Sequence, residues 1–315
     1  MKTFPYFQKL FHTPLMLLAD VRLGMELDLL RVSGLTGEAS GIIMPSAGLR
    51  GQSPQLVARE DTGKPAAADN EWLRQMKSAA ATRSAWRVES IYQTYGSIAV
   101  VHIAGVIDKH ITDSDMSCYG GCDLADVDRA LAKAGADPKI QRVVLNINSP
   151  GGSVLGVAET AARVAKLRET KEVHQFVDGL CCSAAEYIGS QADIRVTAPS
   201  ARSGSIGVYL AVLDATRQAE MEGLKVEIIK AGKWKALGSP FQPLTEEQRT
   251  YLQAQVDDMH TQFKAAVADG RKRAGKTVDA ANMEAQVFTG KQAVEVGLFD
   301  ALTNLNLDEY VASLL

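Results

Sequence analysis

Apolar and polar positions alternate along the second half of the chain in a way that predicts repeated strand–helix units. Near-continuous apolar runs at residues 98–104, 143–147 and 173–177 are typical of strands that are buried on both faces. Apolar side chains recur at helical spacing between and after these runs, at residues 124–134, 154–167 and 184–191. The fold class expected is therefore α/β, with a mostly parallel sheet covered by helices.

The same pattern predicts the remaining elements of the main domain. Strands are expected at residues 86–94, 194–198, 206–210 and 226–229, and helices at 214–222 and 245–268. The strand at 86–94 would form a hairpin with 98–104 through a turn at Tyr95 and Gly96. Thr245 and Gln248 form a capping box, which announces the long helix at 245–268.

Residues 1–84 differ in character from the rest, and the chain is expected to have three parts. Residues 1–33 form an N-terminal helical segment, with one helix from near Pro14. Residues 34–84 form a linker rich in Gly, Ser, Pro and Ala, followed by a short helix from near Glu71. Residues 85–315 form the main domain.

Ser183 lies in the stretch Gly-Leu-Cys-Cys-Ser-Ala-Ala-Glu-Tyr-Ile at residues 179–188, where a strand turns sharply into a helix. This position suits a nucleophile, because the hydroxyl is lifted off the sheet and the free N–H groups of the first helical turn point to where an oxyanion would form. The alternative is close strand–helix packing, with the serine only capping the helix.

A second turn, Asn-Ser-Pro-Gly-Gly-Ser at residues 148–153, also joins a strand to a helix. Gly151 and Gly152 let the backbone approach a ligand closely and leave N–H groups unshielded, as an oxyanion hole requires. A plain Pro-Gly turn is the alternative. Two such turns on successive strands of one sheet favour a catalytic site.

Composition and charge exclude several classes of function. The net charge of −3 argues against nucleic-acid binding. The apolar run at residues 15–32 carries Asp20, Arg22, Glu26, Asp28 and Arg31, so neither a signal peptide nor a membrane anchor is expected. Neither a metal site nor a disulfide framework is expected, and a reducing, cytoplasmic location fits the cysteines Cys118, Cys122, Cys181 and Cys182.

A serine nucleophile needs a base, and the sequence leaves its identity open between histidine and lysine. None of the histidines follows the serine within the next two strands (His12, His102, His110, His174 and His260). The loop at residues 231–240 offers Lys233 and Lys235 beside apolar neighbours, where desolvation would favour a neutral amine. Solvated surface lysines are the alternative.

Five segments together resemble the serine–lysine peptidases of the signal peptide peptidase A family, which share the Clp protease/crotonase fold. They are Asn-Ser-Pro-Gly-Gly at 148–152, Cys-Ser-Ala-Ala-Glu-Tyr at 182–187, Ser-Gly-Ser-Ile-Gly-Val at 203–208, Ala-Gly-Lys-Trp-Lys-Ala at 231–236 and Val-Phe-Thr-Gly-Lys-Gln-Ala at 287–293. The resemblance implies a serine endopeptidase without a cofactor. The roles it implies are Ser183 as nucleophile, Lys235 as base, Gly151 and Gly152 as the oxyanion turn, Ala184 as a further N–H donor and Ser205 as a support for the lysine. Cys182 and Glu186 depart from what relatives often carry beside the nucleophile.

The segment Phe-His-Thr-Pro-Leu-Met-Leu at residues 11–17 resembles the opening of lambda-type phage capsid-maturation proteases. That resemblance implies capsid, portal or scaffold proteins as substrates, and no membrane. In relatives of this family the serine and lysine come together between protease modules, which implies a homo-oligomer here. The apolar stripes of helices 15–32 and 245–268 make them the expected contact surfaces. The alternative is that both helices pack on their own subunit. The alternatives are a cellular signal-peptide-peptidase-like protease, a non-catalytic capsid-assembly component and, less favoured, a crotonase-type acyl-CoA enzyme.

Overall fold

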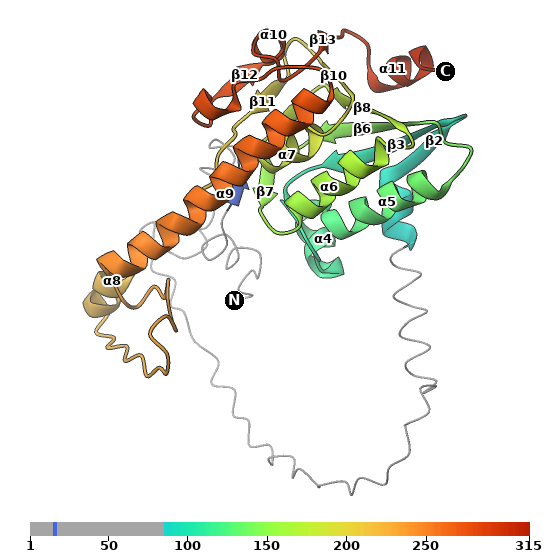
Figure 1. Cartoon of the computed structure of the whole chain (residues 1–315). Coiled ribbons are helices and arrows are strands. Elements are labelled where there is room, and N and C mark those ends of the chain that lie inside the picture. Colours follow the sequence, from blue (N-terminus) through green and yellow to red (C-terminus); the bar gives the residue numbers. More distant parts are fainter. Residues whose placement is uncertain (1–14, 18–84) are drawn as a thin grey trace, which may run out of the picture.

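A computed structural model describes residues 15–17 and 85–315 of the chain, and its centre is a six-stranded sheet (Figure 1). The strand order is β13-β10-β8-β6-β3-β2, in which β2 is antiparallel to β3 and the other neighbours are parallel. The strands are β2 (Tyr92–Tyr95), β3 (Ile98–Ala104), β6 (Arg142–Asn148), β8 (Glu172–Val177), β10 (Ile194–Thr197) and β13 (Ala301–Leu302). The mostly parallel α/β architecture predicted from the sequence is confirmed.

Helices cover both faces of this sheet, because successive side chains of its strands point to opposite sides. On one face, Ala99, Val101 and Ile103 of β3 join the main core beneath α5 (Leu124–Ala136) and α6 (Val157–Leu167). On the other face, a smaller apolar cluster lies under α11 (Leu307–Ser313). The apolar runs in the sequence therefore reflect strands that are buried on both sides.

Two smaller sheets hold the turns that the sequence analysis singled out. One has the order β12-β11-β9, and the other β1-β7-β4-β5. Their strands are β1 (Leu15–Leu17), β4 (Ile107–Asp108), β5 (Cys122–Asp123), β7 (Gly151–Ser153), β9 (Leu180–Cys182), β11 (Arg202–Gly204) and β12 (Val287–Thr289). The glycine turn runs from the end of β6 into β7, which contains both glycines, and β9 leads directly into Ser183 and α7 (Ala184–Gly189).

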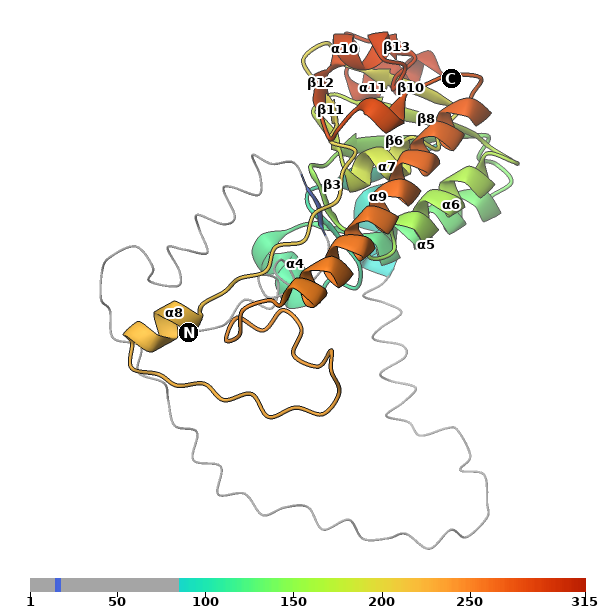
Figure 2. The ribbon, with the colours of Figure 1, turned by 60° about the vertical axis from the view of Figure 1, so that its left-hand side comes forward.

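Helix α9 (Glu246–Arg273) begins at the predicted capping box and is longer than expected at its C-terminal end. Its C-terminal half packs on the body, where Phe263 stacks on Tyr187 of α7 with ring centroids 5.0 Å apart. Its N-terminal half extends beyond the body and carries residues 212–244, which we call the arm (Figures 1 and 2). The arm includes the short helix α8 (Thr216–Met221).

Besides the helical residues 85–91, the described chain contains three other helical elements. They are α4 (Asp113–Tyr119), the 3₁₀ helix η1 (Ala280–Asn282) and α10 (Gly290–Glu295). Within the described ranges, no helix combines the length and apolar character needed to cross a membrane.

Three predicted strands are wrong in whole or in part. Residues 85–91 are helical and only β2 is extended, since Val88 and Ile91 are spaced to turn one helical face toward the core. No strand forms at 206–210, because the positive φ of 54° at Ser205 ends β11. Residues 226–229 also form no strand: they lie in the arm, where Ile229 is 93% exposed and has no strand beside it.

The N-terminal prediction needs one correction. Residues 15–17 form strand β1, which pairs with β7, so the predicted helix does not begin at residue 15. The rest of that helix and the predicted linker lie outside the described residues. The division into three parts stays a prediction.

Candidate active site

Ser183 occupies a strained turn between β9 and α7. Its φ of 57° and ψ of −119° lie outside the regions that non-glycine residues ordinarily adopt. The turn is held because the Ser183 N–H donates to the carbonyl of Gly204 at 2.8 Å. Such strain persists only where surrounding structure enforces it, and it is concentrated at functional sites.

The Ser183 hydroxyl is buried and makes no hydrogen bond to any partner. In particular, it makes no capping bond to α7, which removes the alternative that this serine serves as an ordinary helix cap. A buried hydroxyl without a partner is costly, so it calls for an explanation. A nucleophile that awaits its base and substrate supplies one.

The glycine turn lies directly beside this serine. Ser149 and the β9 strand bond to each other twice, from the Ser149 N–H to the carbonyl of Leu180 at 2.8 Å and from the Cys182 N–H to the carbonyl of Ser149 at 3.1 Å. Helix α7 also contacts β7. The two predicted turns are therefore brought together in space, as an oxyanion hole and a nucleophile would need to be.

The two glycines of the turn have different roles. The Gly151 N–H is already bonded to the Ser149 hydroxyl at 3.1 Å, and its φ of 102° favours glycine. At Gly152 the reason is space, because a Cβ there would lie 1.9 Å from the carbonyl oxygen of Ile107 on β4. Of the two, Gly152 is the one whose N–H has no side-chain acceptor among the described hydrogen bonds.

Ala184 and Ser205 also lie at this site. Ala184 is the first residue of α7, so its N–H has no partner in the helical ladder. Ser205 follows Gly204, whose carbonyl binds the Ser183 N–H, and its own backbone has a positive φ of 54°. The structure thus gathers Ser183, Gly151, Gly152, Ala184 and Ser205 around one point.

Cys182 precedes the serine but is not equipped to replace it as nucleophile. Burial, together with the nearby Glu186 carboxylate, raises the pKa of the Cys182 thiol to about 12. Because the thiolate is the reactive form of cysteine, this side chain is inert near neutral pH.

Lys235 is not brought to Ser183 within the chain. It is exposed, whereas Ser183 is buried, and the arm to which it belongs extends from the N-terminal end of α9, away from α7 (Figures 1 and 2). The neighbouring Lys233 forms an ion pair with Glu247 of α9, whereas the Lys235 amine has no ion pair or hydrogen bond within the described part of the chain. The two lysines therefore differ in that only Lys233 is paired with a described carboxylate.

The lysine loop is nevertheless held by specific contacts. Trp234 stacks on Tyr251 of α9 with ring centroids 4.8 Å apart, and the Gln242 side chain donates to the carbonyl of Ala236 at 2.7 Å. Ala236 has a positive φ of 64°, which turns the chain sharply after Lys235. These contacts fasten Lys235 to the end of α9.

Sequence analysis missed a buried ion pair behind the nucleophile. Glu186 of α7 and Arg195 of β10 are both fully buried, and Arg195 Nη2 lies 2.8 Å from Glu186 Oε2. Arg195 also donates to Gln175 and, at 2.6 Å, to the carbonyl of Leu298. A glutamate inside the apolar face of a short helix was the one signal that could have indicated it.

This pair continues into a second one that reaches α9. The backbone N–H of Arg195 donates to Asp300 Oδ2 at 2.7 Å. The guanidinium of Arg271, at the C-terminal end of α9, donates to the other oxygen of Asp300 at 2.6 Å. Burial alone would lower the pKa of Arg195, but the Glu186 carboxylate outweighs it and raises that pKa. The guanidinium therefore stays charged in the interior.

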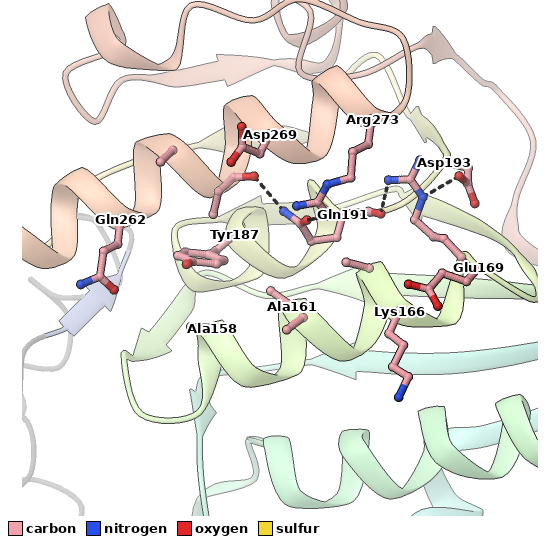
Figure 3. A pocket seen from close by; sticks show the side chains of 15 residues that line it. Ala158, Ala161, Lys166, Glu169, Tyr187, Gln191, Asp193, Gln262, Asp269 and Arg273 are labelled. Carbon is pink, nitrogen blue, oxygen red and sulfur yellow. Dashed lines mark hydrogen bonds and ion pairs between the residues drawn. The ribbon is translucent and has the colours of Figure 1, made fainter.

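A cavity of about 850 Å³ lies between α6, α7 and α9 (Figure 3). Alanines of α6 and α9 form its walls, and Tyr187 reaches it from α7. At its edge, Arg273 donates to the Gln191 side chain at 3.2 Å. None of the site residues expected from the sequence lines it. The described residues also contain no cluster of His, Cys, Asp or Glu that could hold a metal ion.

Comparison with known proteins finds relatives among proteases. Residues 165–313 match the model of Peptidase family S49. The chain is 30% identical over 218 residues to Capsid assembly protease C of Escherichia phage lambda, covering 68% of the chain and 48% of that protein. It is 30% identical over 223 residues to Head-tail preconnector protein GP5 of Enterobacteria phage P21, with coverages of 69% and 43%.

A cellular protein also matches. Protease 4 of Salmonella typhi is 30% identical over 211 residues, which cover 66% of the chain and 33% of that protein. The chain thus spans at most about half the length of each of these three relatives.

Proposed function

The chain carries a domain of peptidase family S49, and on this premise we propose that it is a serine endopeptidase with Ser183 as nucleophile and Lys235 as general base. The observation that carries the proposal is the Ser183 hydroxyl, buried and unpartnered on a strained turn beside the glycine turn. No structural role accounts for that combination, because the hydroxyl neither caps the helix nor bonds to a neighbour.

The chemistry follows from the arrangement of these groups. Lys235, as a neutral amine, takes the proton from Ser183 as its Oγ attacks a peptide carbonyl, and then gives that proton to the leaving amine. The N–H groups of Gly152 and Ala184 hold the oxyanion of the tetrahedral intermediate. The same lysine then takes a proton from water as the water attacks the acyl-enzyme carbonyl, and it returns that proton to Ser183 Oγ as the ester bond breaks and the second product leaves. Loss of one oxyanion donor typically costs about 3 kcal/mol of transition-state stabilisation.

In this proposal Lys235 reaches Ser183 of a neighbouring copy of the chain. The arm that carries it exposes several large apolar side chains, with Ile229 93% exposed, Met221 81%, Leu224 56% and Phe241 45%. Exposed apolar side chains gathered on a projecting segment are typical of a protein–protein contact. Contact with a second copy would cover them, remove Lys235 from water and complete the site, with Ser205 beside the lysine.

Mixing two inactive variants tests this arrangement. Ser183→Ala and Lys235→Ala proteins should each be inactive against a peptide substrate, while mixed oligomers should regain part of the wild-type activity at sites that receive both intact residues. Differently labelled subunits show whether exchange has occurred, and Lys233→Ala mixed with Ser183→Ala serves as the matched control. A mixture that exchanges subunits but stays inactive would place both residues of a site in one chain.

We further propose that the substrates are capsid, portal or scaffold proteins, cut in the host cytoplasm or prohead during head maturation. The phage relatives, whose names refer to capsid assembly and to a head–tail preconnector, support this proposal. The first test is whether portal, scaffold and capsid genes lie next to this one, and the second is incubation of the protein with their products. Cleavage of one of these should be lost in Ser183→Ala.

A cellular protease is the second candidate, favoured by the similarity to Protease 4. An acyl-CoA hydratase or isomerase is disfavoured, because such enzymes usually work through a glutamate. The glutamate next to this site, Glu186, is fully buried and bound to Arg195.

A further inference from the structure

Strand β1 covers the outer edge of the strand that contains the glycine turn. The pairing is antiparallel, with Leu15 opposite Ser153, Met16 opposite Gly152 and Leu17 opposite Gly151. The other edge of β7 is already paired with β4 through Ile107 and Gly152. In Figure 1, β1 lies beside β7 below α7. Residues 15–17 therefore occupy the edge of β7 that no other described strand covers.

This edge is suited to bind any extended peptide. Two of the three β7 residues are glycines, so the edge presents backbone N–H and C=O groups with almost no side chains to select what binds. Adding a strand to such an edge is a common mode of peptide recognition, in which main-chain hydrogen bonds supply the affinity. Peptides bound opposite Gly151 and Gly152 would be recognised by their backbone.

The position of the edge connects it with the reaction. Helix α7, which begins at Ser183, contacts β7, and Gly152 belongs to β7 itself. A peptide whose carbonyl is to reach both Ser183 and the Gly152 N–H must therefore lie along this edge. In the structure Ser183 is fully buried, and the β7 edge beside it is covered by β1.

We propose that Leu15–Leu17 binds the β7 edge in the place of an extended peptide substrate, so that the chain's own N-terminal segment competes with substrate for one site. This inference rests on the proposed peptidase function and specifies its substrate as a peptide segment bound in β conformation. It also makes β1 an inhibitory segment, which a substrate must displace before Ser183 can act.

A proline scan of β1 provides a sharp test, because hydrogen bonds in an antiparallel pair alternate. Either Met16 alone, or Leu15 and Leu17 together, donate N–H groups to β7. Proline removes the N–H of the residue it replaces. A proline at a donating position should therefore release β1 from β7, and we call these variants the released class. A proline at a position that does not donate should leave β1 in place, and we call these variants the tolerated class. The released class should show a KM for a short fluorogenic peptide lowered about tenfold with kcat unchanged, and the tolerated class provides the matched control.

A second measurement does not depend on activity. In the Ser183→Ala background, amide hydrogen exchange at Gly151–Ser153 should become faster in the released class only. A synthetic peptide of residues 13–20 should bind the released variants and slow that exchange again.

The outcomes separate the two proposals. If all three proline variants keep the wild-type KM and exchange, β1 does not occupy the substrate edge and the inference is wrong. If amide hydrogen exchange at Gly151–Ser153 is faster in the released variants only, but even the wild type hydrolyses no peptide, then the pairing of β1 with β7 is correct and the peptidase assignment is wrong.

Discussion

Replacing the buried ion pair behind the nucleophile tests how the site is held. In Arg195→Met, the Glu186 carboxylate would remain in the interior without its partner. One of its oxygens, Oε1, already lacks a hydrogen bond, and neither side chain has any exposure to water. The variant should therefore be strongly destabilised, although a methionine of similar length fills much of the space.

The magnitude follows from the burial of both groups. Removing one partner of a buried ion pair typically costs about 3–5 kcal/mol of unfolding free energy. For a domain of this size, each kcal/mol lowers the melting temperature by about 2–4 °C, so a decrease of roughly 6–20 °C is expected. The Leu298 carbonyl and the Gln175 side chain also lose a donor, which places the expected value in the upper part of this range.

The double variant Glu186→Leu with Arg195→Met separates charge from packing. Apolar replacement of a whole buried ion pair is often close to neutral, so the double variant should be more stable than Arg195→Met by about 2 kcal/mol or more. Urea and thermal unfolding, both in the Ser183→Ala background to prevent self-digestion, measure this difference. Arg129→Met is the control, because Arg129 pairs with Asp126 while 48% exposed and its loss should cost about 1 kcal/mol or less.

Two results would refute the reasoning. If Arg195→Met were no less stable than the Arg129→Met control, the buried pair would contribute no more to the free energy of unfolding than an exposed pair does. If the destabilisation of the double variant equalled the sum of the two single variants, Glu186 and Arg195 would act independently and the unpaired carboxylate would not be the cause.

Other predictions concern the base, the glycine turn and acid stability. Lys235→Ala should abolish peptide hydrolysis while Lys233→Ala retains most of it, and the reverse result in a steady-state assay would show that the loop register is wrong. Gly152→Ala should lose activity and unfold more easily in a thermal melt, since its Cβ would lie 1.9 Å from a carbonyl oxygen of β4; a folded, active variant would contradict that geometry. Burial alone would raise the pKa of Asp300, but the hydrogen bond and charge of Arg271, the backbone N–H of Arg195 and the charge of Lys276 together outweigh it, so the pKa is lowered. The stabilisation is therefore present above the unfolded pKa of about 3.9 and is lost as the pH falls through the lower folded value. Asp300→Asn should be destabilised at pH 7, with the difference from wild type shrinking below about pH 4 in urea titrations; a difference independent of pH would rule out the charge as its cause.

Local signals in the sequence were sufficient to predict most strands of the central sheet and the turn that carries Ser183. The runs at 98–104, 143–147 and 173–177 are so continuously apolar that only burial on both faces satisfies them, and all three are strands of the central sheet. The start of α9 at Thr245 and the sharp turn at Ser183 were also predictable, because capping and turn chemistry act within a few residues.

Tertiary structure alone decided which distant segments pair or contact each other. Residues 226–229 have a strand-like composition but no neighbour to pair with, whereas β1 lies in a segment of helical pattern and pairs with β7. Strand pairing depends on which edge is free, and no local pattern encodes that. For the same reason, the sequence indicated Lys235 as a candidate base but not its position on the arm. Nor did it indicate that Glu186 would meet Arg195, since a buried charge is tolerated only where the fold delivers its partner.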